Sequence, residues 1–299
     1  MFGLSKTYIA LVAAGAVIIA VGTYILVSTP APEPAPTPVV VEVAEIVAID
    51  PIATRTIGTS VEGRDITVTT IGTGSTTLLF VGGIHGGYEW NTALLAYQMI
   101  DHFTADPSLV PENITLAIVP DLNPDGTFLL SGTEGQFTLA DVRNTATRET
   151  PGRFNANGID LNRNFDCRWQ PESTWRGEVR SAGTAPFSEP EAAAIRDWVL
   201  ENNPAAVAFW HSIGDAVFTS ECGAGVMPST EALMNTYAAA SGYDAAGLWT
   251  AYQVTGDAEG WLATLGIPAV TVEFAAFNDP EFTQNLAGVE AVLEAYSTE

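Results

Sequence analysis

Two histidines and two glutamates are the residues whose types and positions could do chemistry together. His85 lies in a glycine-rich turn, Gly82-Gly83-Ile84-His85-Gly86-Gly87, and Glu89 follows that turn. His211 comes directly after an apolar run, and Glu273 lies inside another. Two imidazoles and one carboxylate can hold zinc and leave one position open for water. The second glutamate could then act as a general base.

Each of these residues also has a purely structural interpretation. A glycine-rich turn after a strand commonly carries a polar residue without binding anything, and His211 could be a hydrogen-bonded core residue. Glu273 is harder to explain in this way, because an acid in the run Val270-Thr-Val-Glu-Phe274 would point into a buried region without need. The third histidine, His102, lies at the polar end of a predicted helix and is interpreted as a surface residue.

Short apolar runs bounded by turn residues predict the strands that position these side chains. The predicted strands cover residues 77–81, 114–120, 205–210 and 269–274, with a further strand in the latter part of 61–71. Helical spacing predicts helices over 91–103, 189–202, 230–240, 258–265 and 282–296. Asn123-Pro-Asp-Gly126 predicts a turn. Strands that alternate with helices predict an α/β domain with a largely buried sheet.

Composition excludes one class of partner and permits a large core. The formal net charge is −24, with 11 lysines and arginines against 35 acidic residues. So few cations cannot form a basic patch, so nucleic acid is excluded as the expected partner. Long mixed stretches at 127–153 and 166–186 are expected to form functional rims.

The N-terminal region predicts an export signal followed by a spacer. Residues 8–27 form an uncharged apolar run long enough to cross a bilayer, preceded by Lys6. We therefore expect a transmembrane anchor over 1–28, a proline-rich linker over 29–45 and a catalytic domain over 46–299. The alternative is a cleaved signal peptide. In both cases the domain lies outside the cytoplasm, where Cys167 and Cys222 could form a disulfide or remain two buried thiols.

Six motifs in order resemble zinc carboxypeptidases of the carboxypeptidase A/B type, and especially bacterial members that include murein-peptide amidases. The motifs are His85 with Glu89-Trp90, Asn123-Pro-Asp-Gly126, Arg153-Phe-Asn-Ala-Asn-Gly-Ile-Asp-Leu-Asn-Arg-Asn-Phe165, His211-Ser212, Tyr252-Gln253 and Thr271-Val-Glu-Phe274. The resemblance spans about residues 58 to 275. It implies a mixed, mostly buried sheet of eight strands sandwiched by helices in a single catalytic domain.

The resemblance also implies a role for each matching residue. His85, Glu89 and His211 would bind one Zn²⁺ per chain, and Asp160 would orient His85. Glu273 would be the general base. The substrate's terminal carboxylate would be bound by Asn162 and Arg163, and Tyr252 would close over it. Arg153 would stabilise the oxyanion, with Arg143 and Arg148 as alternatives. The family usually has two residues between the first histidine and the glutamate, whereas this chain has three.

The implied activity is removal of C-terminal residues from peptides by a metallocarboxypeptidase. Alternatives are a cell-wall peptide amidase that acts around diaminopimelate, and a zinc- or peptide-binding module without turnover. The expected partners are a peptide or muropeptide and, through the N-terminal helix, the membrane. The residue seven positions after the mobile tyrosine, Glu259, would form the floor of the pocket for the terminal side chain and favour a cation there. Acids in the first turn of a helix are also favoured without any substrate.

Overall fold

The computed structural model describes residues 50–142 and 151–298, and the account below concerns these residues alone. Within them, no helix combines the length and the apolar character needed to cross a membrane. The predicted anchor (1–28) and linker (29–45) lie outside the described residues, so the expected membrane span is still a prediction.

One large mixed sheet organises the described residues. In spatial order its strands are β1 (Ile52–Thr59), β2 (Asp65–Ile71), β4 (Ile114–Val119), β3 (Thr76–Val81), β7 (Ala206–Ser212), β10 (Ala269–Phe274), β8 (Ala216–Thr219) and β9 (Asp244–Leu248). The four central strands β4, β3, β7 and β10 are parallel. β1, β2 and β8 join through antiparallel pairs, and β9 runs parallel to β8. The expected eight-stranded mixed sheet is confirmed.

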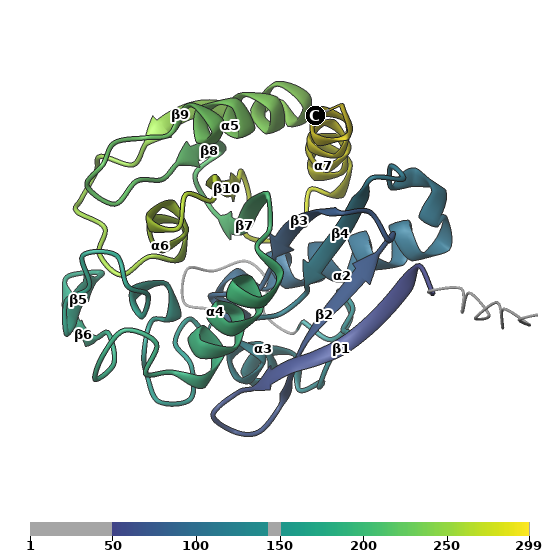
Figure 1. The fold of residues 1–299 in the computed structure, drawn as a ribbon. Coiled ribbons are helices and arrows are strands. Elements are labelled where there is room, and N and C mark those ends of the chain that lie inside the picture. Colours follow the sequence, from purple (N-terminus) through teal and green to yellow (C-terminus); the bar gives the residue numbers. More distant parts are fainter. Residues whose placement is uncertain (1–49, 143–150, 299) are drawn as a thin grey trace, which may run out of the picture. The chain divides into compact units, whose positions relative to one another are not determined.

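Helices cover both faces of this sheet because its central strands are apolar on both sides. Leu78 and Phe80 point into one core, and Leu79 and Val81 point into the other. The first core is completed by α2 (Trp90–Ala105), α5 (Pro228–Ser241) and α7 (Phe282–Ser297). The second is completed by α4 (Pro190–Asn202) and α6 (Ala258–Thr264), which lie on the opposite face (Figure 1). The arrangement is an α/β sandwich, as the alternation of elements predicted.

The order of the strands creates a place for a site between β3 and β7. From β3 the chain passes through α2 into β4 on one side, whereas β7 lies on the other side of β3. Loops that leave two neighbouring parallel strands in opposite directions open a crevice at the carboxyl ends of those strands. His85 follows β3, and His211 lies near the end of β7.

Two segments form regular structure where the sequence predicted a turn or a long loop. Asn123 caps the helix α3 (Pro124–Ser131) instead of only opening a turn, since its side chain accepts the N–H of Gly126 at 3.0 Å. The predicted rim at 166–186 contains a hairpin, β5 (Glu172–Trp175) and β6 (Glu178–Ser181).

A disulfide joins Cys167 to Cys222, with the two Cα atoms 5.7 Å apart, and so confirms the predicted pairing. Cys167 follows the segment that carries Asn162 and Arg163. Cys222 follows β8. The bridge therefore links two segments that contribute to one cleft, described below.

Candidate metal centre and active site

Two imidazole nitrogens converge on the carboxylate of Glu89. The Nδ1 atom of His85 lies 2.9 Å from Oε1 of Glu89, and Nδ1 of His211 lies 3.1 Å from Oε2. All three side chains are buried, and one ligand atom from each lies within 4.8 Å of the others. Two nitrogens and a carboxylate with room for a further ligand form the donor set of a catalytic zinc site. The residues present therefore fit zinc.

The additional residue between His85 and Glu89 is accommodated by the glycine turn. Residues Gly86–Glu89 form a short 3-10 helix that returns the Glu89 carboxylate to the His85 ring. Gly86 has φ +45°, and a Cβ atom there would lie 2.7 Å from the carbonyl oxygen of Gly152. A side chain at this position would be strained in its backbone and too close to that oxygen. Reading Glu89 as the ligand is therefore consistent with the structure.

Each metal-facing histidine has a carboxylate on its far side. Nε2 of His85 lies 3.2 Å from Oδ1 of Asp160, and Nε2 of His211 lies 3.5 Å from Oε1 of Glu259. A carboxylate that accepts the other ring N–H fixes the tautomer and the orientation of a ligating histidine. Asp160 occupies the position expected for this role. The contact between Glu259 and His211 was not expected from the sequence.

Buried acids and cations lie in contact around the metal-ligating residues. Burial disfavours charge on His211, but the carboxylates of Glu259 and Glu89 outweigh it and raise its pKa to about 10. Burial likewise opposes ionisation of Asp160, yet the Arg153 guanidinium holds the pKa of that carboxyl well below its usual range. Buried groups whose pKa values are strongly shifted by specific charged neighbours are typical of functional sites.

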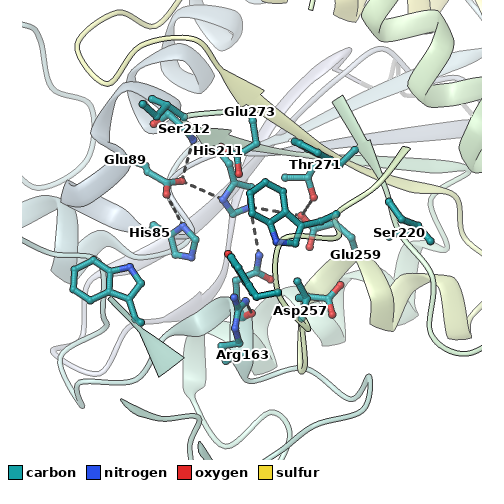
Figure 2. Close-up of a pocket in the computed structure, with 18 of the residues that line it drawn as sticks. His85, Glu89, Arg163, His211, Ser212, Ser220, Asp257, Glu259, Thr271 and Glu273 are labelled. Carbon is teal, nitrogen blue, oxygen red and sulfur yellow. Dashed lines mark hydrogen bonds and ion pairs between the residues drawn. The ribbon is translucent and has the colours of Figure 1, made fainter. Parts of the chain in front are cut away.

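Glu273 reaches the same centre from the neighbouring strand. Glu273 on β10 pairs in register with His211 on β7, and Figure 2 shows both side chains directed into the cleft. Its Oε2 atom is buried without a hydrogen-bond partner among the described residues. Burial is the main cause that raises the pKa of Glu273 to about 7, with a contribution from Glu89, against the opposing effect of His211. A carboxyl with a pKa near neutrality can exchange a proton, as a general base must.

Arg153 lies beside the metal-ligating residues. Its Nε and Nη2 atoms donate to Oδ2 of Asp160 at 3.1 and 2.9 Å. Its Nη1 atom lies 3.3 Å from Nδ1 of His85 and 3.5 Å from Oε1 of Glu89. Arg143 and Arg148, the alternatives for the same role, lie outside the described residues.

The residues expected to bind the substrate's end line the same cleft, whose volume is about 490 Å³. The Asn162 side-chain oxygen accepts the N–H of Ala258 at 2.9 Å, and Arg163 donates to the main-chain carbonyl of Asn162. Tyr252 is 56% exposed, with its ring edge-on to Trp249 at 5.2 Å. Glu259 is buried and accepts the hydroxyl of Thr271 at 2.8 Å.

The structure thus brings the predicted residues together. Nine line one cleft, and the tenth, Asp160, lies behind His85. The nine are His85, Glu89, Arg153, Asn162, Arg163, His211, Tyr252, Glu259 and Glu273.

Sequence reasoning missed a group at the other end of the cleft. Tyr88, Trp175 and Arg176 also line it. For Trp175 and Arg176 the signal is the presence of three arginines in the predicted rim at 166–186 of a chain otherwise poor in cations; Tyr88 has no such signal.

Comparisons with known proteins agree with this geometry. The model of the zinc carboxypeptidase family matches residues 45–282. The chain is 26% identical over 244 residues to gamma-D-glutamyl-L-diamino acid endopeptidase 1 of Lysinibacillus sphaericus, covering 75% of this chain and 61% of that protein. It is 26% identical over 220 residues to murein peptide amidase A of Escherichia coli K12, covering 69% of this chain and 74% of that protein.

A solved structure with the same fold is carboxypeptidase A from Helicoverpa armigera. The TM-score is 0.64 at 24% identity, and the match covers 83% of this chain and 69% of that one. Several curated relatives are longer proteins, and this chain spans about half to three fifths of their length.

Proposed function

The chain belongs to the zinc carboxypeptidase family, a metallopeptidase family whose cofactor is zinc, and from this we propose that it removes the C-terminal residue of peptides. His85, Glu89 and His211 would hold the metal, which supplies a Lewis acid that polarises a carbonyl and activates water. Glu273 accepts a proton from the attacking water and delivers it to the leaving amine. Arg153 donates to the carbonyl oxygen as negative charge develops there.

The observation that carries this proposal is the state of Glu273. Its carboxylate is directed at the metal-ligating residues, has a buried oxygen without a described hydrogen-bond partner, and has a pKa raised to about 7. A module that only binds peptides or zinc has no need for such a group, because an unpaired buried carboxylate destabilises the fold. The non-catalytic alternative is disfavoured for this reason.

The part of the cleft that lies on the other side of His211 from His85 and Glu89 supports selection for a terminal side chain that carries a cation. Asp257 and Glu259 both line it, and the pKa of Asp257 is raised to about 6 by burial and by the charge of Glu259. A cation placed beside Asp257 would stabilise the ionised form of its carboxyl. Asn162 and Arg163 would bind the terminal carboxylate, and Tyr252 would close over the bound residue.

A cell-wall peptide amidase is the second candidate. Diaminopimelate carries both an amino group and a carboxylate on its side chain, and Arg168 lines the cleft together with the acids. The similarity to a murein peptide amidase and to a gamma-D-glutamyl-L-diamino acid endopeptidase supports this substrate class.

The decisive experiment measures release of the C-terminal amino acid from ordinary peptides and from muropeptides by mass spectrometry. The zinc-loaded protein should release a terminal residue, a chelator should stop release, and added zinc should restore it. The Glu273→Gln variant serves as the matched inactive control. Faster cleavage of muropeptides than of any ordinary peptide would favour the amidase activity over the carboxypeptidase activity. If the zinc-loaded protein binds peptides but releases no terminal amino acid, both proposed enzyme activities are refuted.

We further propose that the domain acts outside the cytoplasm, tethered through residues 1–28. The support is the apolar run at 8–27 and the disulfide between Cys167 and Cys222.

A further inference from the structure

The few cations of this chain gather around the cleft. Only 11 residues in the sequence are lysine or arginine, yet four arginines line this one cavity: Arg153, Arg163, Arg168 and Arg176. Arg153 and Arg163 have roles in the proposed reaction, and Arg168 is paired with Glu221. Arg176 has no role in that reaction.

Arg176 occupies a backbone position that does not favour arginine. The β5–β6 hairpin turns through two residues, Arg176 and Gly177, with φ angles of +53° and +81°. Two-residue hairpin turns with both φ angles positive strongly favour Asn-Gly, because asparagine tolerates the left-handed conformation better than a long side chain. The turn itself therefore does not require arginine at this position.

Aromatic rings hold the Arg176 side chain at the cleft. Its guanidinium carbon lies 4.4 Å from the ring centre of Trp175, and Nη2 donates to the hydroxyl of Tyr88 at 3.3 Å. Trp175 in turn packs edge-on against Tyr88 at 5.7 Å and against Phe154 at 5.4 Å. The tip of the hairpin is thereby fixed next to Tyr88, the residue that directly precedes the metal ligand Glu89.

This cation lies on the side of the metal centre that is opposite to the terminal pocket. Figure 2 shows His85 and Glu89 on one side of His211. Asp257 and Glu259 lie on its other side, where the terminal side chain would bind. A peptide that places its last residue there must run back over the metal centre, so its preceding residue lies beside Tyr88 and the hairpin.

We propose that Arg176, with Tyr88 and Trp175, forms a subsite for a carboxylate carried by the residue that precedes the cleaved bond. This inference rests on the proposed peptidase function. A forked guanidinium suits a carboxylate, and the Trp175 ring orients the guanidinium of the exposed Arg176. The carboxylate could belong to an α-linked aspartate or glutamate, or to a γ-linked glutamyl residue, whose free α-carboxylate remains next to the chain.

The test compares blocked dipeptides that differ only in the residue before the cleaved bond: glutamate, glutamine or γ-linked glutamate. All three end in the residue that the wild-type protein releases fastest. Wild type should favour the better of the two glutamate peptides over the glutamine peptide by about two- to fivefold in kcat/KM, as expected for an ion pair with an exposed guanidinium. The ratio of kcat/KM between the two glutamate peptides shows whether the subsite prefers the α-linked or the γ-linked residue.

The informative variant is Arg176→Asn, because Asn-Gly suits the turn and the hairpin should still form. The better turn offsets the lost contacts with Trp175 and Tyr88, so we expect a melting temperature close to that of wild type, while the glutamate preference falls to about one. Arg176→Lys should retain part of the preference. The control Arg180→Gln changes an arginine of the same hairpin that does not line the cleft and that pairs with Glu178; it should leave the preference intact.

Equal rates for glutamate and glutamine in wild type, or a preference that persists in Arg176→Asn, would overturn the proposal. If no peptide is cleaved, the proposed function has failed. The subsite can then still be tested by calorimetry, which measures the affinity of the zinc-loaded protein for the same three peptides. Tighter binding of a glutamate peptide that is lost in Arg176→Asn would support the subsite without turnover, and equal affinities would refute it.

Discussion

Replacing Glu259 by glutamine separates two proposed roles of one carboxylate: positioning His211 and forming the floor of the pocket for the terminal side chain. Oε1 of Glu259 faces Nε2 of His211 at 3.5 Å and also accepts the hydroxyl of Thr271. Glutamine keeps the size of the side chain and can still accept the Thr271 hydroxyl through its amide oxygen. The change therefore removes the negative charge beside His211 with little disturbance of packing.

The magnitude follows from the geometry of the two carboxylate–histidine pairs. Loss of a partner behind a ligating histidine typically lowers metal affinity about 10- to 100-fold. The 3.5 Å contact of Glu259 is longer than an ordinary N–H···O hydrogen bond, so we expect the lower end, about tenfold. Asp160 is closer to His85, at 3.2 Å, and also pairs with Arg153. Asp160→Asn should therefore lower zinc affinity about a hundredfold.

The assay is competition for zinc between the protein and a chelator of known affinity. Asp257→Asn is the matched control, because Asp257 lines the same cleft but serves as the cap of α6, a role that asparagine can also fill. Unchanged zinc affinity in Glu259→Gln would refute the positioning role. A wild-type preference for lysine over leucine at the peptide terminus that disappears in Glu259→Gln would support the pocket role. Equal rates for these two peptides in wild type would contradict it.

Three further perturbations probe the metal, the base and a buried acid. Glu89→Ala leaves two histidines without their shared carboxylate, so zinc measured by mass spectrometry should fall well below one per chain; stoichiometric zinc would show that another carboxylate binds. Glu273→Gln should keep zinc and circular dichroism but lower kcat at least about a hundredfold, and near-normal kcat would place the base elsewhere. Burial raises the pKa of Asp121 from 3.8 to about 7, so its ionisation opposes folding and the free energy of unfolding should fall as pH rises from about 4 to 7. At about 1.36 kcal/mol per pKa unit, Asp121→Asn should remove up to about 4 kcal/mol of that fall in urea titrations, and parallel pH curves for variant and wild type would contradict this.

The elements that carry the metal ligands were predictable because their signals are local. β3, β7 and β10 are continuous apolar runs, which identify buried parallel strands in the sequence itself. His211 and Glu273 follow or interrupt such runs, and their chemical types restrict what they can do. The same residues then matched an ordered set of family motifs.

Two of the strands that were missed, β1 and β9, lack that kind of signal. β1 is mostly exposed and its apolar residues do not alternate, while β9 contains a glycine and lies largely in solvent. Strands of this kind form because a neighbouring strand offers hydrogen bonds, which no local pattern reveals. The approach of Glu259 to His211 is likewise a tertiary contact between α6 and β7, and the spacing along the chain carries no information about it.

The Cys167–Cys222 bridge has a consequence for how the protein is produced. It closes a separation of 55 residues, which corresponds to about 4 kcal/mol of chain entropy removed from the unfolded state. Material made in a reducing host compartment will lack this contribution. The segment that holds Ser220 and Glu221 against Arg168 will then be less constrained, whereas His85, Glu89 and His211 are positioned by other elements. Batches from oxidising and reducing hosts should therefore carry the same amount of zinc and yet differ in heat resistance and in the terminal residues that they accept.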